Sequence, residues 1–259
     1  MGGRGATSSS GKMGAMGGAT LQPQVDSNAQ VDTTQVASAF SADYNAFMAM
    51  TDDEKADFIE ANMRQGVPAH LAQNDFQKFI YNSGLNERPD LVDDATLDSM
   101  TGTELFRTVN NVHDKQNDIG YTADQIANQL MKGRVTRVSD KGGSAYGRGL
   151  YFADNYSDSA DVYGNTRGNI KATAVMRAKL NNNAKVMNYS QATKGALQEI
   201  SNGTKLGKVL KKCDYGSAES IYAMAKGYNV LAYSGYFNVL NRNAITMSLD
   251  VKPKGSKWK

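Results

Sequence analysis

The stretch Gly142-Gly-Ser-Ala-Tyr-Gly-Arg-Gly-Leu-Tyr-Phe-Ala153 is the most distinctive part of the sequence and decides the predicted fold. Its four glycines within eight residues let the backbone approach a ligand closely, because glycine has no side chain to intervene. The aromatic run from Leu150 to Ala153 predicts a short strand on which a planar ring can stack. The glycines precede the strand and open no helix, so the stretch is not a dinucleotide-binding fingerprint. We therefore expect a glycine-rich loop that leads into a ligand-binding strand.

A polar segment follows this strand, Asp154-Asn-Tyr-Ser-Asp-Ser-Ala-Asp-Val-Tyr163. Its spacing allows a short helix from Ser157 to Tyr163. Such a helix places Ser159 and Tyr163 one turn apart on the same face, because residues four apart in a helix are neighbours.

Arg107 lies amid apolar residues in a strand predicted from Glu104 to Val109. A buried guanidinium is costly unless it meets an anion, and its planar fork matches phosphate or carboxylate. The alternative interpretation is an arginine on an edge strand that faces water. The sequence of the segment leaves both interpretations open.

The remaining folded part mixes helices and strands without a regular βαβ order. Capping boxes at Thr51-Asp-Asp-Glu54 and Thr122-Ala-Asp-Gln125 begin two helices, and Ser234-Gly235 is typical of a tight hairpin turn. Expected helices are 52–64, 69–82, 122 to about 133, 190–202 and 217–226, and expected strands are 104–109, 149–153, 170–180, 229–233, 236–240 and 244–249. Polar and apolar residues alternate over 170–180, which is typical of a half-buried strand. This order predicts an α+β domain with a largely antiparallel sheet.

Residues 1–38 predict a flexible arm rich in glycine, serine and alanine. Seven of the 25 glycines fall between Gly2 and Gly18, in a stretch without acidic or aromatic residues. Such a segment has little to bury, so conformational entropy opposes its folding. It is either a disordered tail or a docking arm that becomes ordered on a partner. The folded domain is expected from Ala39 to Lys259.

The composition argues against several classes of protein. Cys213 is the single cysteine and can form neither an intramolecular disulfide nor a thiolate metal site. The neighbouring Lys211 and Lys212 are expected to lower its pKa slightly, but no paired base is visible. His70 and His113 stand outside any metal-ligand spacing, so no metal is expected. No apolar run approaches the roughly 20 residues of a membrane-spanning helix. The 29 basic and 26 acidic residues are too evenly balanced to indicate nucleic acid.

Three segments, in this order, resemble the NAD-dependent ADP-ribosyltransferases: Leu105-Phe-Arg-Thr-Val, Tyr146-Gly-Arg-Gly-Leu-Tyr-Phe-Ala-Asp and Tyr236-Phe-Asn-Val-Leu-Asn-Arg. The middle segment is most similar to the poly(ADP-ribose)-polymerase branch, whose pattern is a Gly-x-Gly-(Ile/Leu)-Tyr-Phe-Ala strand followed by Ser-x-Ser-Ala and a second tyrosine. Here that tyrosine, Tyr163, lies one residue further along. Arg107 resembles the arginine-led branch of bacterial toxins, because the polymerase branch has histidine there.

The resemblance covers about Thr103 to Leu249, a little over half of the chain. It implies a mostly antiparallel split β-sheet, with an NAD-binding core over residues 103–259 and a helical lobe over residues 39–102. It also implies that NAD is a substrate, cleaved between nicotinamide and ribose through a positively charged oxocarbenium-like state.

The resemblance further implies the roles of individual residues. Arg107 is expected to bind a phosphate, Tyr151 and Tyr163 to stack on the nicotinamide, and the backbone of Thr108 to bind it by hydrogen bonds. The implied binding residues are Arg107, Thr108, Ser144, Gly147, Gly149, Tyr151, Phe152, Ala153, Ser159, Tyr163 and Asn238, and the implied catalytic residues are Arg107, Tyr151 and Tyr236. Ser144 and Ser159 are expected to contact the ribose or the carboxamide.

The glutamate of the family is missing. The family places it just before the third segment, where it stabilises the developing cation, whereas this chain has no carboxylate between Glu219 and Asp250. Tyr236 occupies the nearest position. Either weak activity survives, since losing one such group costs about 10²–10³ in rate, or Glu104 or Glu219 supplies the carboxylate.

The start Met1-Gly-Gly-Arg-Gly, followed by Ser8-Ser-Ser-Gly11, resembles that of minor structural proteins of tailed bacteriophages. The expected function is transfer of ADP-ribose to a host protein or other macromolecule in the bacterial cytoplasm, by a protein carried in the virion or made early. The alternative is a virion interaction protein, bound to capsid or portal components, with a weak or inactive NAD-binding fold. Neither a membrane nor nucleic acid is expected as a partner.

Overall fold

The computed structural model describes residues 44–68, 74–85, 88–114, 119–132, 146–159 and 174–253. Contacts divide the chain into two compact units, Met1–Asp32 and Thr33–Lys259, and every described residue belongs to the second unit. The predicted arm over 1–38 therefore lies outside the described residues. The same is true of Ser144, Tyr163 and His70.

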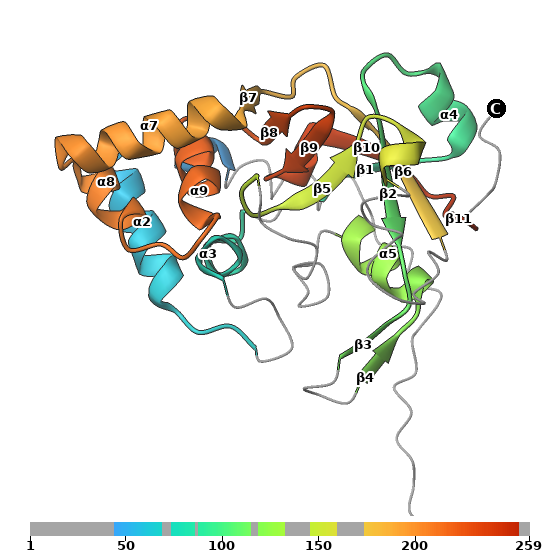
Figure 1. Ribbon diagram of the computed structural model, residues 1–259, viewed down its shortest axis with the longest axis horizontal. Coiled ribbons are helices and arrows are strands. Elements are labelled where there is room, and N and C mark those ends of the chain that lie inside the picture. The colour runs from blue at the N-terminus through green and yellow to red at the C-terminus, as the bar shows by residue number, and fades with distance from the viewer. Residues whose placement is uncertain are drawn as a thin grey trace, which may run out of the picture. The chain divides into compact units, whose positions relative to one another are not determined.

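One mixed sheet forms the centre of the second unit (Figure 1). Its strands follow the order β1-β10-β6-β2-β5-β9-β8-β7, with β11 also paired to β6. They are β1 (Asp90–Val92), β2 (Glu104–Val109), β5 (Leu150–Ala153), β6 (Ala174–Leu180), β7 (Val186–Asn188), β8 (Val230–Tyr233), β9 (Tyr236–Val239), β10 (Ile245–Ser248) and β11 (Lys252–Pro253). Among the described residues, β1–β10 and β7–β8 pair in parallel and the other neighbours antiparallel. The predicted α+β class with a largely antiparallel sheet is confirmed.

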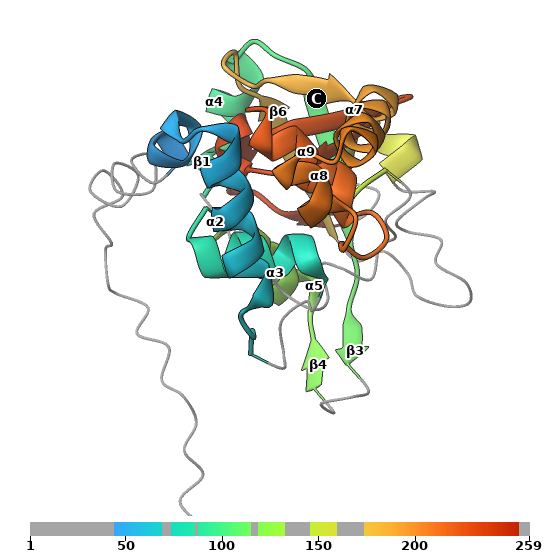
Figure 2. The ribbon, with the colours of Figure 1, turned by 90° about the vertical axis from the view of Figure 1, so that its left-hand side faces the viewer.

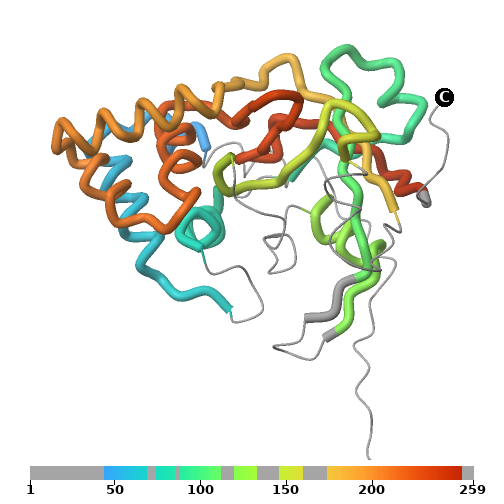
Figure 3. Tube along the Cα trace, viewed as in Figure 1, coloured from blue at the N-terminus to red at the C-terminus, as the bar shows by residue number. Residues whose placement is uncertain are grey.

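The sheet consists of two halves that meet at one point. Strands β2 and β5 share the single residue pair Phe106 and Ala153, whereas β2 and β6 pair along the whole of β2. One half is therefore β1-β10-β6-β2 and the other is β5-β9-β8-β7. The chain crosses from the second half back to the first between β9 and β10, as the trace in Figure 3 shows. A separate hairpin joins β3 (Val112–Asp114) to β4 (Ile119–Tyr121).

Most helices gather beside the second half of the sheet (Figures 1 and 2). The α-helices are α2 (Asp52–Arg64), α3 (Asp75–Ser83), α4 (Asp94–Ser99), α5 (Ala123–Met131), α7 (Tyr189–Asn202), α8 (Lys205–Leu210) and α9 (Ser217–Ala225). A 3₁₀ turn, η2 (Arg242–Ala244), precedes β10. Helix α2 begins and ends where the sequence predicts, and the capping box of Thr51 and Glu54 is present. Residues 69–73 of the predicted second helix lie outside the described residues, and α3 begins at Asp75.

Helices from the N-terminal and the C-terminal parts of the described chain share one apolar core. Ile59 and Phe79, from α2 and α3, pack in the same buried cluster as Leu206 and Ile221, from α8 and α9. In addition, β1 lies within the predicted helical lobe but pairs with β10. The expected boundary between residues 102 and 103 therefore does not separate two cores, because α2 and α3 complete their burial against α7, α8 and α9.

A second core lies between one face of the sheet and α5. Ile126 and Leu130 of α5 pack with Leu105 of β2 and Met176 of β6. Strand side chains alternate between faces, so these contacts identify which side chains of each strand face α5. We call this side the α5 face.

Strand β6 is buried on both faces, so the expectation of a half-buried strand is wrong. Met176 and Ala178 pack on the α5 face, while Arg177 and Lys179 point to the opposite face and are only 3% and 9% exposed. The segment with α4 covers them: Lys179 Nζ donates to the backbone oxygens of Asp98 and Met100. The polar residues are covered because a distant segment supplies their partners.

Candidate functional site

The three motif segments form three adjacent strands. Strand β2 carries the first segment, β5 the second and β9 the third, and they lie side by side in the order β2-β5-β9. Tyr151 pairs with Asn238 and Ala153 with Tyr236 across β5 and β9. Segments far apart along the chain are thus neighbours in the sheet.

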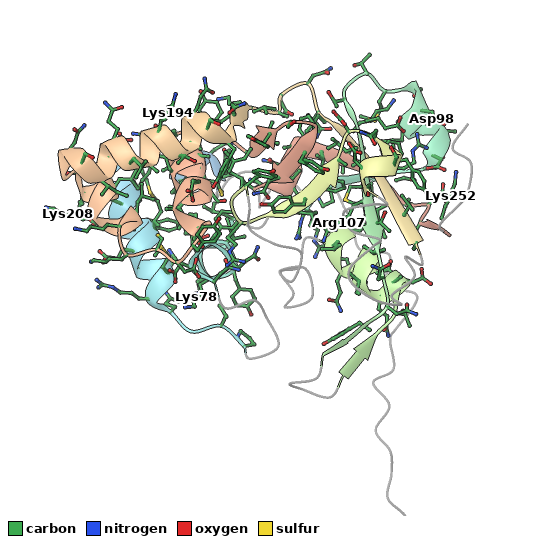
Figure 4. The ribbon with its side chains drawn as sticks, viewed as in Figure 1. Lys78, Asp98, Arg107, Lys194, Lys208 and Lys252 are labelled. Carbon is green, nitrogen blue, oxygen red and sulfur yellow. The ribbon has the colours of Figure 1, made fainter. Side chains whose placement is uncertain are left out.

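Arg107 is buried at this junction, with 8% of its surface exposed. Its Nη1 donates a hydrogen bond of 2.7 Å to the backbone oxygen of Tyr151, so the side chain extends from β2 toward β5 (Figure 4). Strand β2 lies between β6 and β5, so the alternative of an edge-strand arginine facing water is wrong.

The pleat of the strands separates Arg107 from Tyr151. Arg107 pairs with Met176 and alternates with Leu105 and Val109, so its side chain leaves β2 on the α5 face. Tyr151 alternates with the core residue Phe152, so its ring leaves β5 on the opposite face. The guanidinium reaches the backbone of Tyr151 and not its ring, and the two predicted catalytic side chains do not converge.

A second arginine, which the sequence reasoning missed, lies close to Arg107. Arg242 in η2 is 7% exposed, and burial together with the charge of Arg107 lowers its pKa to about 10. It closes the third motif segment, and the crossing of the chain from β9 to β10 brings it over the sheet. Its signal in the sequence was its place at the end of the third motif segment, two residues after the apolar Leu240.

Thr108 and Ser159, two of the binding residues that the resemblance implies, form hydrogen bonds with each other. Thr108 N donates to Ser159 Oγ at 2.9 Å, and the two hydroxyls lie 3.1 Å apart. Both residues are buried. A carboxamide can bind these groups by replacing the hydrogen bond between them.

The hydroxyl of Tyr151 fastens the glycine-rich loop. It donates to Gly147 O at 2.5 Å and accepts from Tyr146 N at 3.0 Å. The ring is 7% exposed, and hence buried by the protein itself. Phe152 and Ala153 are completely buried, with Phe152 in the core on the α5 face.

Gly147 and Gly149 allow close approach, but the approaching groups belong to the protein. Gly147 has φ of 88°, and a Cβ atom there would lie 2.6 Å from Ser220 Oγ. A Cβ atom on Gly149 would collide with Asn238 Oδ1. Asn238 is 1% exposed and donates from Nδ2 to Tyr146 O, whereas its Oδ1 accepts no hydrogen bond within the described part of the chain. The glycines therefore permit the packing of the loop on β9 and α9.

Four tyrosines gather at the β8–β9 hairpin. Tyr146 stacks on Tyr233 with ring centroids 4.3 Å apart and lies nearly parallel to Tyr236 at 6.2 Å. Tyr189 meets Tyr146 edge to face at 5.7 Å. Ser234 and Gly235 both have positive φ, 47° and 83°, which confirms the predicted tight turn between β8 and β9. Tyr236 is thus part of an aromatic group on the hairpin.

Three carboxylates are candidates for the missing glutamate. Glu104 binds Arg177 through Nε and Nη2, so it is engaged at the other end of β2. Glu219 Oε1 accepts from Tyr189 Oη at 3.4 Å, and burial followed by the charge of Glu219 raises the pKa of Tyr189. Asp154, which sequence reasoning did not select, lies beside the hairpin turn.

The position of Asp154 follows from the strand register. Because Ala153 pairs with Tyr236, the next residue lies beside Gly235, and Asp154 N donates to Gly235 O at 2.9 Å. A Cβ atom on Gly235 would lie 3.1 Å from Asp154 Oδ1 and 3.4 Å from Oδ2. Asp154 thus brings a carboxylate to the place just before Tyr236.

The expectation for Cys213 is wrong. Burial, and then the charges of Asp75, Asp214 and Glu219, raise the pKa of its thiol to about 12. The flanking lysines do not offset this, since Lys212 pairs with Glu60 on α2. Cys213 is therefore a packing residue of the helical core.

Neither a metal-binding group nor a membrane-spanning helix is present within the described residues. No group of three or more histidine, cysteine, aspartate or glutamate side chains there is arranged to hold a metal ion. No helix in the same ranges has the length and apolar character needed to cross a membrane. Comparison of the chain with family models, with curated proteins and with solved structures gives no match.

Proposed function

We propose that this protein binds NAD at strands β2, β5 and β9 and transfers ADP-ribose to a macromolecule of a bacterial host. The observation that carries the proposal is that the three motif segments, distant in sequence, are adjacent strands. Arg107 is buried where they meet. The adjacency of the strands is an observation separate from the residue identities that carry the resemblance. It supports the resemblance because burial and strand pairing, and not the order of segments along the chain, decide which strands are neighbours.

Different residues are proposed to bind different parts of NAD. Arg107 carries a charged fork that suits a phosphate oxygen. Thr108 N and Ser159 Oγ bind the carboxamide of nicotinamide after their mutual hydrogen bond opens. The aromatic group with Tyr236 borders the place where the ribose is expected.

In the reaction the bond between the nicotinamide nitrogen and ribose C1′ breaks, and nicotinamide leaves with the electron pair. An acceptor nucleophile then bonds to C1′ and gives up a proton to solvent. Positive charge develops on the ribose before the new bond forms, so a nearby carboxylate lowers the barrier. Asp154 is the carboxylate that we assign to this role, because it lies beside Gly235 while Glu104 is engaged with Arg177.

The test is transfer of label from NAD to proteins of a bacterial lysate, together with release of nicotinamide. Wild-type protein should label at least one band, and Arg107→Ala should remove the label. Asp154→Asn should slow labelling by about 10²–10³, the usual effect of losing one electrostatic group. Arg64→Ala is the matched control, because Arg64 is an exposed arginine on α2.

The outcomes separate the parts of the proposal. Equal labelling by wild type and Arg107→Ala would contradict the binding role of Arg107, and no NAD cleavage by wild type would contradict the activity. If Glu219→Gln abolishes labelling and Asp154→Asn does not, the carboxylate is Glu219.

A second function is favoured by one observation. Ser159, Thr108 and Tyr151 already satisfy polar groups of the protein. This is the arrangement expected of an inactive NAD-binding scaffold that serves as a virion interaction protein. It predicts that the protein co-purifies with capsids and does not turn over NAD, so clean wild-type protein that cleaves NAD would count against it.

A further inference from the structure

We propose that Ser220 of helix α9 is a positioning residue for the ligand site at β2, β5 and β9. Its hydroxyl holds the end of the glycine-rich loop, residues Tyr146 to Gly149, in the conformation that a ligand meets. The identification of this ligand with NAD rests on the function proposed above. The motif resemblance assigns no role to Ser220, which belongs to none of the three motif segments.

The hydroxyl of Ser220 binds both backbone polar groups of Arg148. Ser220 Oγ accepts from Arg148 N at 2.7 Å and donates to Arg148 O at 2.7 Å. The oxygen of Gly216, four residues earlier, lies 3.4 Å from the same hydroxyl. A helical serine commonly bonds the carbonyl four residues before it. Here the shorter hydrogen bonds go to Arg148, so the hydroxyl binds the loop in preference to its own helix.

The backbone of Arg148 depends on such external contacts because two glycines flank it. Glycine adopts many backbone conformations and therefore does not fix the path of its neighbour. Gly147 has φ of 88°, which favours glycine, and a Cβ atom there would lie 2.6 Å from Ser220 Oγ. Glycine at this position lets the hydroxyl reach the loop, and the two hydrogen bonds then select the conformation of Arg148.

Two other side chains fasten the same loop from the sheet. Tyr151 Oη accepts from Tyr146 N and donates to Gly147 O. Asn238 Nδ2 donates to Tyr146 O at 3.0 Å. Ser220 adds a contact from α9, so the loop is held between the sheet and the helical core.

The helical core fixes the position of Ser220. Ser220 and the neighbouring Ile221 are completely buried, and Ile221 packs in the apolar cluster that α9 shares with α2, α3 and α8. On the other side of the contact, the loop carries Tyr146, whose ring stacks on Tyr233 in the aromatic group beside Tyr236. A shift of the loop would therefore move this ring together with the start of β5. Through Ser220, the helical core sets the geometry of the ligand site.

Hydrogen exchange of the Arg148 amide, measured by NMR on the full-length chain, tests the contact. Ser220→Ala removes the acceptor of this amide and should speed its exchange on the order of 10-fold or more. Ser220→Cys nearly keeps the volume of the side chain but forms only weak hydrogen bonds, and it should have the same effect. Ser217→Ala is the matched control. Ser217 is also completely buried on α9, but its Oγ accepts from Phe76 N of α3 and not from the loop.

Equilibrium binding of NAD by the same variants tests whether the loop conformation matters to the ligand. The apparent dissociation constant rises as the fraction of protein in the binding-competent conformation falls. It should rise about 10-fold in Ser220→Ala and Ser220→Cys and keep the wild-type value in Ser217→Ala. In the labelling assay, the Ser220 variants should show a raised KM for NAD with kcat little changed.

The outcomes separate the positioning role from the proposed function. Unchanged Arg148 exchange in Ser220→Ala would overturn the positioning role. Unchanged NAD binding in this variant, or equal weakening by Ser217→Ala, would also overturn it, because the loss would then be absent or merely structural. If NAD binding depends on Ser220 but wild type does not cleave NAD, the positioning role stands and the proposed transfer fails. If wild type does not bind NAD, the proposed function fails, and the exchange of Arg148 alone decides whether Ser220 positions the loop.

Discussion

The two faces of strands β2 and β6 carry buried arginines in opposite electrostatic settings. On one face, Arg177 of β6 is surrounded by carboxylates: it binds Asp94, Asp98 and Glu104. On the α5 face, Arg107 of β2 donates to a carbonyl, and its charge acts on a second arginine, Arg242. The neighbouring strands β2 and β6 thus each bury an arginine, one beside carboxylates and the other beside a backbone carbonyl and a second arginine.

The pKa values express this difference. Burial alone would lower the pKa of Arg177, but hydrogen bonds to Asp98 and Glu104 outweigh burial and the pKa rises. For Arg242, burial and the nearby Arg107 act in the same direction and the pKa falls to about 10. The Arg177 cluster therefore stabilises the fold by pairing a buried cation with carboxylates, whereas burial and the charge of Arg107 disfavour the charged form of Arg242.

The largest expected effect is on stability, from Arg177→Met. Its side chain is 4% exposed, and its removal leaves three carboxylates without their shared cation. Breaking a buried ion cluster by removing one partner costs about 3 kcal/mol or more. Urea unfolding should show this loss, with Arg64→Met changing stability by less than about 1 kcal/mol because its ion pair is exposed. A loss as small as that of the control would mean that the cluster is not structural.

The second largest expected effect is also on stability, and it concerns Thr108 of β2, which lies on the same sheet face as Arg177. Ser159→Ala removes the acceptor of Thr108 N, which is buried. An unsatisfied buried donor costs about 1–3 kcal/mol, and the free energy of unfolding should fall by that amount. Ser157→Ala is the control, since Ser157 is exposed. No change in Ser159→Ala would indicate that this hydrogen bond is easily exchanged, as carboxamide binding requires.

A smaller effect is expected for Arg242→Met. Burial and the charge of Arg107 lower the pKa of Arg242, so the folded state disfavours its charged form, and the free energy of unfolding should fall by less than it does for Arg177→Met. Both variants should be measured in the same urea series. Equal losses of unfolding free energy for Arg242→Met and Arg177→Met would contradict the difference between the two faces. In that case the α5-face arginines would also be structural.

The smallest effect concerns acid. Burial raises the pKa of Asp94. Hydrogen bonds from Lys252 and Ser248 and the charges of Lys252 and Arg177 lower this pKa by more than burial raises it, so the net pKa lies below 3.8. A folded-state pKa below the unfolded value contributes stability that is full above 3.8 and is lost as the pH falls through the folded pKa. The stability difference between wild type and Asp94→Asn should therefore be constant at neutral pH and shrink below pH 3.8. A constant difference throughout would contradict this assignment.

Local signals predicted the parts of the fold that depend on near neighbours. The capping box at Thr51 marks the start of α2, and Ser234-Gly235 marks the hairpin turn, because both act within a few residues. Strand β2 also has its predicted bounds. Helix α8 was not predicted. The lysines in this short segment obscure the apolar pattern of Leu206, Val209 and Leu210, which pack in the helical core.

The candidate site was predictable in part for the same reason. The sequence by itself determined which segments carry the chemistry, since Arg107, the glycine-rich loop and Tyr236 stand out within their own motifs. It also determined the class of the fold through the alternation of strands and helices.

Only the tertiary structure decided how those residues combine. Strand pairing put Arg107 and the ring of Tyr151 on opposite faces, placed Asp154 beside Gly235 and brought Arg242 to Arg107. Such contacts depend on register and on which face each strand buries, and a shift of one residue reverses every side chain. No window of local sequence contains that information, because the free energy that selects the register comes from burial against segments far away in the chain.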